Sequence, residues 1–243
     1  MRSKSNILLV VVAALLISVV LLRLFWATPS AAPLKGDSES VLQWRVGTSQ
    51  FYDVELESTW AIQSGGEGGE EAAMKLGAVL ETKALEDRGA EVLVGMRLRE
   101  VDLVIGGARI PDAEGRLGRP FRVLFERSGV PASFAFAAEV GSEDRVLLEN
   151  TVRTFQVSMQ KGDAWDVVEP HPGGAYRAQY TAVGAGTWEK HKVAFVEDAS
   201  AKPEQALRST ERLCIDPEQD WLRSMVVDEV VGASATGLTA KVA

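Results

Sequence analysis

The chain has 243 residues and carries 34 acidic against 26 basic side chains, a formal net charge of −8 at neutral pH. That sign disfavours nucleic acid and anionic lipid surfaces as general partners, because both require a basic footprint. A single cysteine, Cys214, excludes an intrachain disulfide, so packing must stabilise the fold. We expect Cys214 to be a buried small residue on a strand. The length suffices for a core of one or two domains.

Residues 1–27 predict a membrane anchor. An apolar run starts at Ile7 and reaches Trp26, interrupted by one charge, Arg23. It attains the roughly 20 residues that a bilayer core requires if the arginine extends to the headgroups. Basic residues precede the run, so the positive-inside rule places the N-terminus in the cytoplasm. The alternative is a signal peptide cleaved near residues 27–33, which would secrete the remainder.

Residues 28–40 are predicted to form a spacer, and residues 41–243 an exported domain built mainly of strands. In residues 52–63, apolar and polar side chains alternate, which predicts a strand with one buried face. The chain reaches Ala243 inside a strand-like run. This is the pattern expected of a longer protein cut within a strand.

Residues 91–105 predict a strand with an irregularity in its middle. The apolar side chains follow one parity up to Leu98 and the other parity from Val101 onward. A change of parity places both halves of a strand on the same core only if an extra residue is inserted between them. We therefore expect a β-bulge near Arg99 and Glu100.

One helix is predicted among the strands, over residues 142–159, with Ser142 as its N-cap. Its apolar side chains recur at spacings of four, three and four, which places them on one helical face. Packing of that face on the sheet is expected. A helix that binds a groove or a membrane surface is the alternative, although its polar face carries little positive charge. The stripe consists of Leu148, Val152, Phe155 and Met159.

The two histidines do not form a recognisable metal or catalytic motif. There is no pair of histidines at helical spacing and no CxxC, so we expect no metal, no cofactor and no catalytic residue. His171 stands between two prolines and before two glycines, a pattern that also describes a solvated turn between strands. His191 alternates with Lys190 and Lys192, and the sequence leaves open which of them face water.

Residues 165–180 predict a β-hairpin with aromatic side chains on its inner face. Trp165 shares its parity with Val167, and Tyr176 shares its parity with Tyr180 beyond the Pro-Gly turn. The face belongs either to an ordinary core or to a curved sheet that lines an apolar ligand cavity. The residues expected to face such a ligand are Val54, Leu56, Val94, Trp165, Tyr176 and Tyr180.

Part of this hairpin carries a resemblance to a known family. Trp165, Glu169, Gly174, Tyr176 and Tyr180 match a pattern of a Trp, an acidic residue and then Gly-x-Tyr-x-x-x-Tyr. The chain resembles, over residues 45–230, the N-terminal β-rich region of bacterial envelope proteins known mainly from myxobacteria-like genomes. Those proteins look like distant relatives of the vitellogenin N-terminal domain of the large lipid transfer proteins.

The resemblance implies lipid or lipoprotein handling in the animal relatives, and it fixes no ligand or catalytic residue in this chain. In such proteins a helical repeat array follows the β region, whereas this chain reaches Ala243 without one. Its location is expected to be a bacterial inner membrane, crossed once, with the main domain in the periplasm. Secretion after cleavage of the signal is the alternative.

The expected fold is mainly β with one packed helix, an α+β protein with a long curved antiparallel sheet or half-open barrel. The first functional hypothesis is a non-enzymatic, membrane-anchored envelope module that binds or transfers lipid or another apolar ligand. The second is a structural domain that holds a protein partner of the envelope near the membrane. The third and weakest is a hydrolase that uses His171 with a nearby carboxylate.

Overall fold

The computed structural model describes residues 42, 44–62, 70–171, 174–195, 207–216, 221–231 and 236–242. Twelve strands and two helices lie within these residues. The strands are β1 (Ser49–Ile62), β2 (Glu70–Asp87), β3 (Glu91–Ile105), β4 (Ala108–Arg109), β5 (Phe121–Glu126), β6 (Pro131–Phe136), β7 (Ala164–His171), β8 (Gly174–Gly184), β9 (Thr187–Phe195), β10 (Leu207–Asp216), β11 (Trp221–Val231) and β12 (Thr236–Val242). The helices are α2 (Ala113–Leu117) and α3 (Ser142–Thr154).

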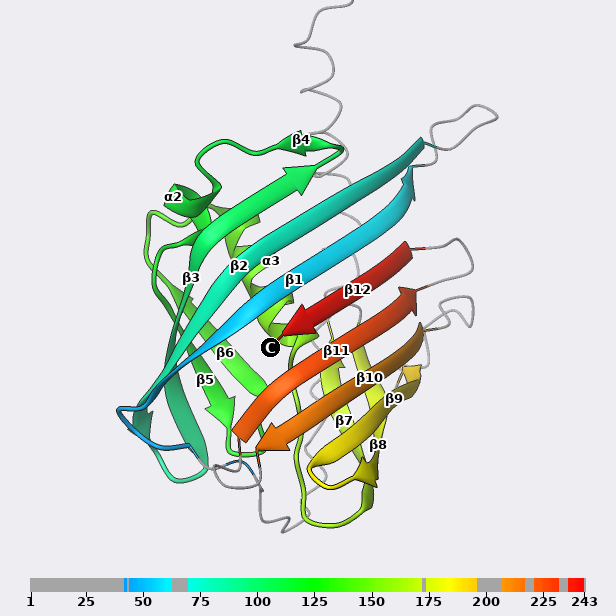
Figure 1. Ribbon diagram of the computed structural model, residues 1–243. Helices are drawn as coiled ribbons and strands as arrows, with labels where there is room; N and C mark the ends of the chain where they lie inside the picture. Colours follow the sequence, from blue (N-terminus) through cyan, green and yellow to red (C-terminus); the bar gives the residue numbers. More distant parts are fainter. Residues whose placement is uncertain are drawn as a thin grey trace, which may run out of the picture.

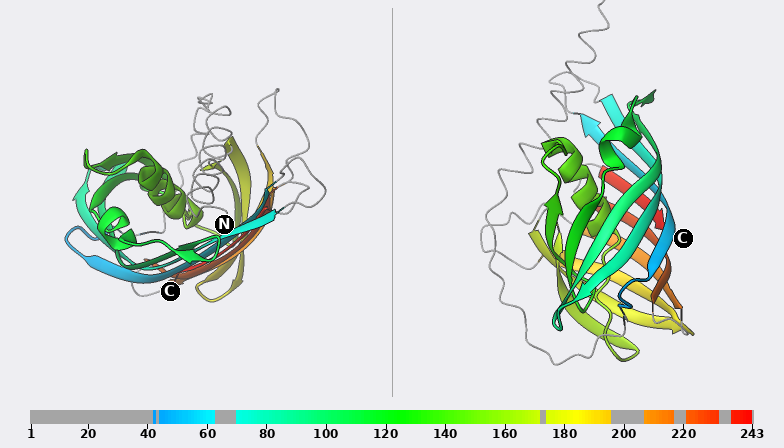
Figure 2. Two further views of the ribbon diagram at one scale, coloured as in Figure 1. Left: turned by 90° about the horizontal axis from the view of Figure 1, so that it is seen from above. Right: turned by 90° about the vertical axis from the view of Figure 1, so that its left-hand side faces the viewer.

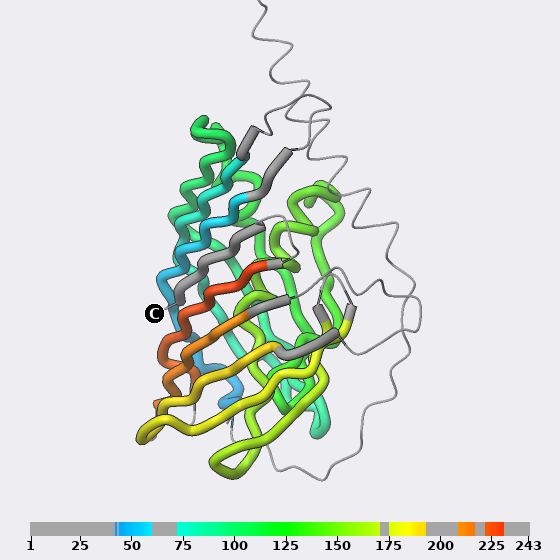
Figure 3. Tube along the Cα trace, turned by 90° about the vertical axis from the view of Figure 1, so that its right-hand side faces the viewer, coloured from blue at the N-terminus to red at the C-terminus, as the bar shows by residue number. Residues whose placement is uncertain are grey.

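All the strands join one antiparallel sheet, in the order β6-β5-β3-β2-β1-β12-β11-β10-β9-β8-β7, with β4 paired to β3 (Figure 1). The sheet is strongly curved, and α3 lies on its concave side (Figure 2). Seen from the side, the helix again lies behind the strands on that face (Figure 3). The prediction of a β-rich fold with a curved antiparallel sheet is confirmed.

The alternation of side chains explains why these segments are strands with one dry face. In β1, Tyr52, Val54 and Leu56 are buried, whereas the intervening acidic residues Asp53 and Glu55 are exposed. The same period of two continues across β2, β3 and β5, so that their inner side chains form one hydrophobic core with those of α3. The convex face of these strands carries their charged side chains.

The predicted bulge in β3 is present. Val79 of β2 pairs with Arg99, and Gly77 pairs with Asp102, so two residues of β3 oppose the single residue between them on β2. Glu100 takes up the extra length with a positive φ of 54°, a conformation uncommon for a residue with a side chain. The insertion keeps the buried side chains of both halves of β3 on the concave side.

The connection from β6 to β7 joins the two opposite ends of the sheet order, and α3 forms its first part. The helix is shorter than predicted. It ends at Thr154, because the N–H groups of Phe155 and Gln156 bond to carbonyls only three residues back. The N-cap is Gly141, which makes no side-chain capping bond, so the expected capping role of Ser142 is wrong. Phe155 and Met159 are buried, but beyond the helix.

The described residues contain a second helix, α2, that the sequence did not predict. Asp112 adopts a positive φ of 57° just before it, and Ala113 and Leu117, one helical turn apart, are its buried residues. Five residues are too few to show a periodic pattern. Neither described helix has the length and apolar character that crossing a bilayer requires. The predicted anchor and spacer lie outside the described residues.

Candidate functional site

The six predicted ligand-facing residues all lie on the inner side of the sheet. Val54, Leu56 and Val94, from β1 and β3, are almost fully buried in the hydrophobic core. Tyr176 and Tyr180 of β8 are equally buried, and Trp165 of β7 is partly buried against the same core. The core therefore has an aliphatic group on β1–β3 and an aromatic group on β7–β8. A role in ligand binding stays a prediction for these residues.

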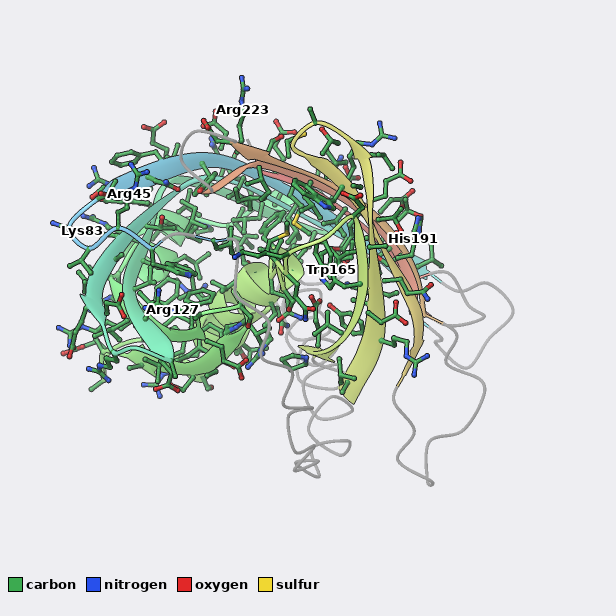
Figure 4. The ribbon with its side chains drawn as sticks, turned by 90° about the horizontal axis from the view of Figure 1, so that it is seen from below. Arg45, Lys83, Arg127, Trp165, His191 and Arg223 are labelled. Carbon is green, nitrogen blue, oxygen red and sulfur yellow. The ribbon has the colours of Figure 1, made fainter. Side chains whose placement is uncertain are left out.

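The β7–β8 hairpin has the pairing that its sequence predicts. Trp165 lies opposite Tyr180, and Glu169 lies opposite Tyr176. The Trp165 and Tyr180 rings stack with their centroids 4.9 Å apart and their planes 12° apart. Viewed from below, Trp165 lies inside the curl of the sheet and His191 lies on its outer side (Figure 4). The hairpin thus carries its aromatic side chains toward the interior.

Five charged side chains are buried beside these aromatic rings, and we call them the charge network. They are Glu169 of β7, Lys190 and Lys192 of β9, Glu211 of β10 and Glu229 of β11, each at most 5% exposed. Charged side chains are rarely buried unless they are paired, so the burial of five together requires a connected set of ion pairs.

The ion pairs link β9 to its neighbour β10 and also to β7 and β11, which each lie two strands away from β9 in the sheet. Lys190 Nζ lies 2.9 Å from Glu169 Oε2 and 2.8 Å from Glu211 Oε2. Lys192 Nζ lies 2.9 Å from Glu211 Oε1 and 2.5 Å from Glu229 Oε2. Each lysine thereby bridges two carboxylates, and Glu211 bridges the two lysines. The strand register explains this geometry, because Lys190 pairs directly with Glu211 across β9 and β10.

Two tyrosines complete the surroundings of Glu169. Tyr176 Oη donates a hydrogen bond of 2.7 Å to Glu169 Oε2, and Tyr180 Oη donates one to Glu169 Oε1. The Lys190 ammonium also lies 5.7 Å from the centroid of each tyrosine ring, within the range of a cation–π contact. Glu169 is therefore held by an ammonium and by two hydroxyl groups at once.

These contacts fix the charge states of Glu169 and Lys190. Burial acts to raise the pKa of Glu169, but Lys190 and the hydrogen bonds from the two tyrosines outweigh it, and the net pKa is lowered. Burial acts to lower the pKa of Lys190, but Glu169 and Glu211 outweigh it and raise the pKa to about 12. Burial, with Glu169 nearby, raises the pKa values of Tyr176 and Tyr180. At neutral pH Glu169 is therefore an ionised carboxylate and Lys190 an ammonium group, beside the neutral phenols of Tyr176 and Tyr180.

Residues 155–159, which follow α3, cover the charge network from inside the sheet, and we call them the strap. All five residues are buried, although none of them belongs to a helix or a strand. Lys190 Nζ donates to the Gln156 carbonyl at 3.1 Å. The Ser158 N–H donates to Tyr180 Oη at 2.9 Å, and Trp165 Nε1 donates to the Ser158 carbonyl at 2.9 Å. Side chains of three strands therefore satisfy the backbone of the strap.

The opposite side of the strap contacts the turn between β5 and β6. The Met159 N–H donates to the Ser128 carbonyl at 3.1 Å. Gly129 approaches the strap so closely that a Cβ atom built on it would lie 2.3 Å from the Val157 carbonyl oxygen. The strap thus spans the interior from β7–β9 to the β5–β6 turn.

His191 does not belong to the charge network. The His191 side chain is 44% exposed and lies 3.8 Å from Glu189 Oε2, while its neighbours Lys190 and Lys192 face inward. An open hollow of about 460 Å³ on the sheet includes His191 in its lining. His171 ends β7 opposite Gly174, and its side chain lies outside the described residues. In the described part of the chain, no three His, Cys, Asp or Glu residues are grouped to hold a metal ion.

Cys214 lies on a strand, as predicted, but it is half-buried rather than fully buried. Its Sγ lies 3.8 Å from Thr187 Oγ1 on β9. Its parity on β10 explains the difference, because the flanking residues Leu213 and Ile215 take the fully buried positions. The thiol is a packing residue beside the core.

Sequence reasoning found the aromatic residues of the site but missed the inward lysines and their partners. Glu169 was singled out as part of a family pattern and as an acid near His171, but not as the partner of a buried lysine. The signal that could have found it is parity, since Glu169 shares the parity of Trp165 and Val167 on β7. The same holds for Glu211, which shares the parity of Leu213 on β10.

Comparisons with known proteins identify a solved structure with a similar fold. No protein-family model matches the chain, and neither does any curated protein. A solved structure concerning lipid–protein interactions in lipovitellin matches it with a TM-score of 0.58 and 13% sequence identity. The chain shares its fold with part of lipovitellin. The match covers 82% of this chain and 25% of the lipovitellin chain, so the chain spans about a quarter of that protein. The vitellogenin-like, β-rich resemblance is thereby supported, and the bacterial envelope relatives stay a prediction.

Proposed function

We propose that the chain is a non-enzymatic module that binds lipid or another apolar ligand on the concave side of its sheet. We further propose that residues 1–27 anchor it in the membrane, which would place the sheet close to a source of lipid. The observation that carries this proposal is the long curved sheet with its apolar inner face, in a fold that matches part of lipovitellin in a structure that concerns lipid–protein interactions.

The inner face of β1, β2, β3 and β5 has the chemistry that an acyl chain requires. Its side chains are aliphatic or aromatic over the whole width of four strands, with Thr82 as the buried polar exception. Transfer of apolar surface from water to such a face is favourable by roughly 25 cal/mol per Å². This face supports a ligand whose main feature is hydrocarbon rather than charge.

The charge network supports a non-enzymatic role. A general acid or base works best with a pKa near the ambient pH. The pKa of Glu169 is lowered and that of Lys190 is raised to about 12, so both groups are held away from neutrality. Their ion pairs connect β7, β9 and β10.

The proposal is tested with cis-parinaric acid, a long-chain fatty acid that fluoresces in apolar surroundings, titrated into the purified full chain. Val94→Phe fills the inner face, where Val94 is 1% exposed, and Val226→Phe is the matched control on the outer face, where Val226 is 46% exposed. The added ring competes with the ligand for the inner face, and a cost of about 1–3 kcal/mol would weaken binding by Val94→Phe roughly five- to 150-fold. Val226→Phe should bind like the wild type.

A structural interaction domain is the second candidate, and one observation favours it. The inner side chains of the sheet, of α3 and of the strap pack in one buried cluster. If the wild-type chain shows no saturable binding of the fatty acid, the lipid proposal is wrong and the interaction domain is the better account. Equal binding by Val94→Phe and Val226→Phe would place any lipid outside the concave face.

A further inference from the structure

The strap, residues 155–159, is a buried segment that belongs to no helix or strand. It makes one backbone hydrogen bond to the rest of the fold in the described residues, from Met159 to Ser128, besides the two that cap α3. Its other tethers are the side chains of Trp165, Tyr180 and Lys190, and the amide of Gln156, which donates to the Pro170 carbonyl at 2.6 Å. A segment held by side chains can detach without breaking any strand pair.

The sequence of the strap has an alternating pattern. Phe155, Val157 and Met159 are apolar and belong to the hydrophobic core cluster. Gln156 lies between them and uses its Nε2 to contact Glu169 Oε2 at 3.4 Å and Tyr176 Oη at 3.0 Å. The strap therefore separates the charge network from the hydrophobic core. Gln156 faces the network, whereas Phe155, Val157 and Met159 face the core.

In the closed position, two polar side-chain atoms of the strap lack hydrogen-bond partners among the described residues. Gln156 Oε1 and Ser158 Oγ are buried, and neither has a hydrogen-bond partner among the described residues. Buried polar atoms without partners destabilise the arrangement that buries them, and such atoms are uncommon in folded proteins. Release of the strap would return both atoms to water, which lowers the free-energy cost of opening.

We propose that the strap is a displaceable gate that closes the interior in the absence of ligand. This inference rests on the proposed lipid-binding function. An acyl chain enters by replacing the side chains of Phe155, Val157 and Met159 against the core, so that one apolar surface substitutes for another. The charge network stays in place, because its ion pairs connect strands rather than the strap. Access to the interior then depends on the population of the open strap.

A reversible lock tests the gate. Met159 donates its N–H to the Ser128 carbonyl, so the two residues are neighbours, and the lock is a disulfide designed between Ser128→Cys and Met159→Cys in a Cys214→Ala background. Loss of two free thiols confirms that it has formed. With the full chain, the oxidised lock should bind cis-parinaric acid at least about tenfold more slowly than the same protein after reduction. Equal rates before and after reduction would overturn the gate.

A matched pair of substitutions tests the gate without a disulfide. Trp165→Phe removes the hydrogen bond to the Ser158 carbonyl and keeps an aromatic ring. Trp188→Phe is the control, because Trp188 Nε1 is buried without a partner in the described part of the chain. Trp165→Phe should speed hydrogen exchange at the strap amides and raise the rate of fatty-acid binding several-fold, about the factor by which opening increases. Trp188→Phe should change neither.

The outcomes separate the gate from the function on which it rests. If wild type and both lock states bind no fatty acid, the lipid-binding proposal fails and the gate fails with it. If the wild type binds saturably, but the lock and Trp165→Phe leave the binding rate unchanged, the gate alone is wrong. Slower binding in the lock together with faster binding in Trp165→Phe supports both.

Discussion

The Lys190 ammonium lies 2.9 Å from the Glu169 carboxylate, and both side chains are completely shielded from solvent. Ion pairs at such positions respond very differently to the loss of one partner than to the loss of both. A single removal leaves an uncompensated charge in the interior, whereas the pair itself contributes little net stability. The charge network should therefore make the fold sensitive to single substitutions.

Lys190→Met should lower the free energy of unfolding by about 3–5 kcal/mol, because Glu169 and Glu211 would each lose a buried cation. Denaturant unfolding followed by circular dichroism measures it. The control is Lys75→Met, which removes an exposed pair with Glu57 and should cost less than about 1 kcal/mol. Similar losses in the two variants would show that the fold is no more sensitive to losing the buried lysine than to losing the exposed one.

The stability of the chain should fall at both ends of the pH scale. Glu169 has a lowered pKa when folded, so its contribution is present above its ordinary value of 4.5 and is lost as the pH falls through the lower, folded value. Lys190 has a raised pKa, so its contribution is present below 10.5 and is lost as the pH rises through about 12.

Denaturant unfolding across this pH range checks both limbs, with Glu169→Gln as the reference. The glutamine cannot titrate, so the stability of this variant should fall less steeply below pH 4.5 than that of the wild type. Tyr176 and Tyr180 also have raised pKa values and add to the alkaline loss above 10. Parallel acid limbs in the two proteins would contradict the role given to Glu169.

Gly129→Ala should destabilise the fold through its contact with the strap. Gly129 has a φ of +104°, and its new Cβ would lie 2.3 Å from the Val157 carbonyl oxygen. We expect a loss of about 2 kcal/mol or more. Gly107→Ala is the matched control, since Gly107 also has a positive φ but faces open space, and strain alone costs about 1 kcal/mol. Thermal unfolding of the two variants should therefore rank Gly129→Ala lower.

The bulge at Glu100 predicts how the melting temperatures of Glu100→Val and Glu100→Gly compare with that of the wild type. Its φ of 54° disfavours residues with a branched side chain and suits glycine. Glu100→Val should lower stability by about 1 kcal/mol, and Glu100→Gly should match or exceed the wild type. The residue is exposed, so burial does not change in either variant. A valine variant as stable as the wild type would contradict the bulge.

Most of the correct predictions from the sequence depended on the local alternation of apolar and polar side chains along strands. The hairpin of β7 and β8 and the bulge in β3 depend on neighbours within one or two strands, and both are present. The end of α3 was wrong because Phe155 and Met159 continue the helical spacing of Leu148 and Val152. The strap's own alternation is only five residues long, too short to compete with that pattern.

The charge network could not be assembled from the sequence, because its members meet only through the sheet order. Lys190 meets Glu211 on the neighbouring strand β10 and Glu169 on β7, two strands away, and no local spacing relates the three. Charged residues on strands are usually solvated, which favours the outward orientation that Lys190 and Lys192 do not adopt. Parity with apolar neighbours indicated burial for Glu169 and Glu211, but it could not name their partners.

The central claim is that the concave face of this sheet holds lipid. Mass spectrometry of organic extracts from the purified full chain, compared with extracts of Val94→Phe prepared in the same way, tests it most directly. We expect a lipid that copurifies with the wild type in a fixed proportion and is depleted in the variant. An extract of the wild type without lipid, or with no more than the variant, would contradict it.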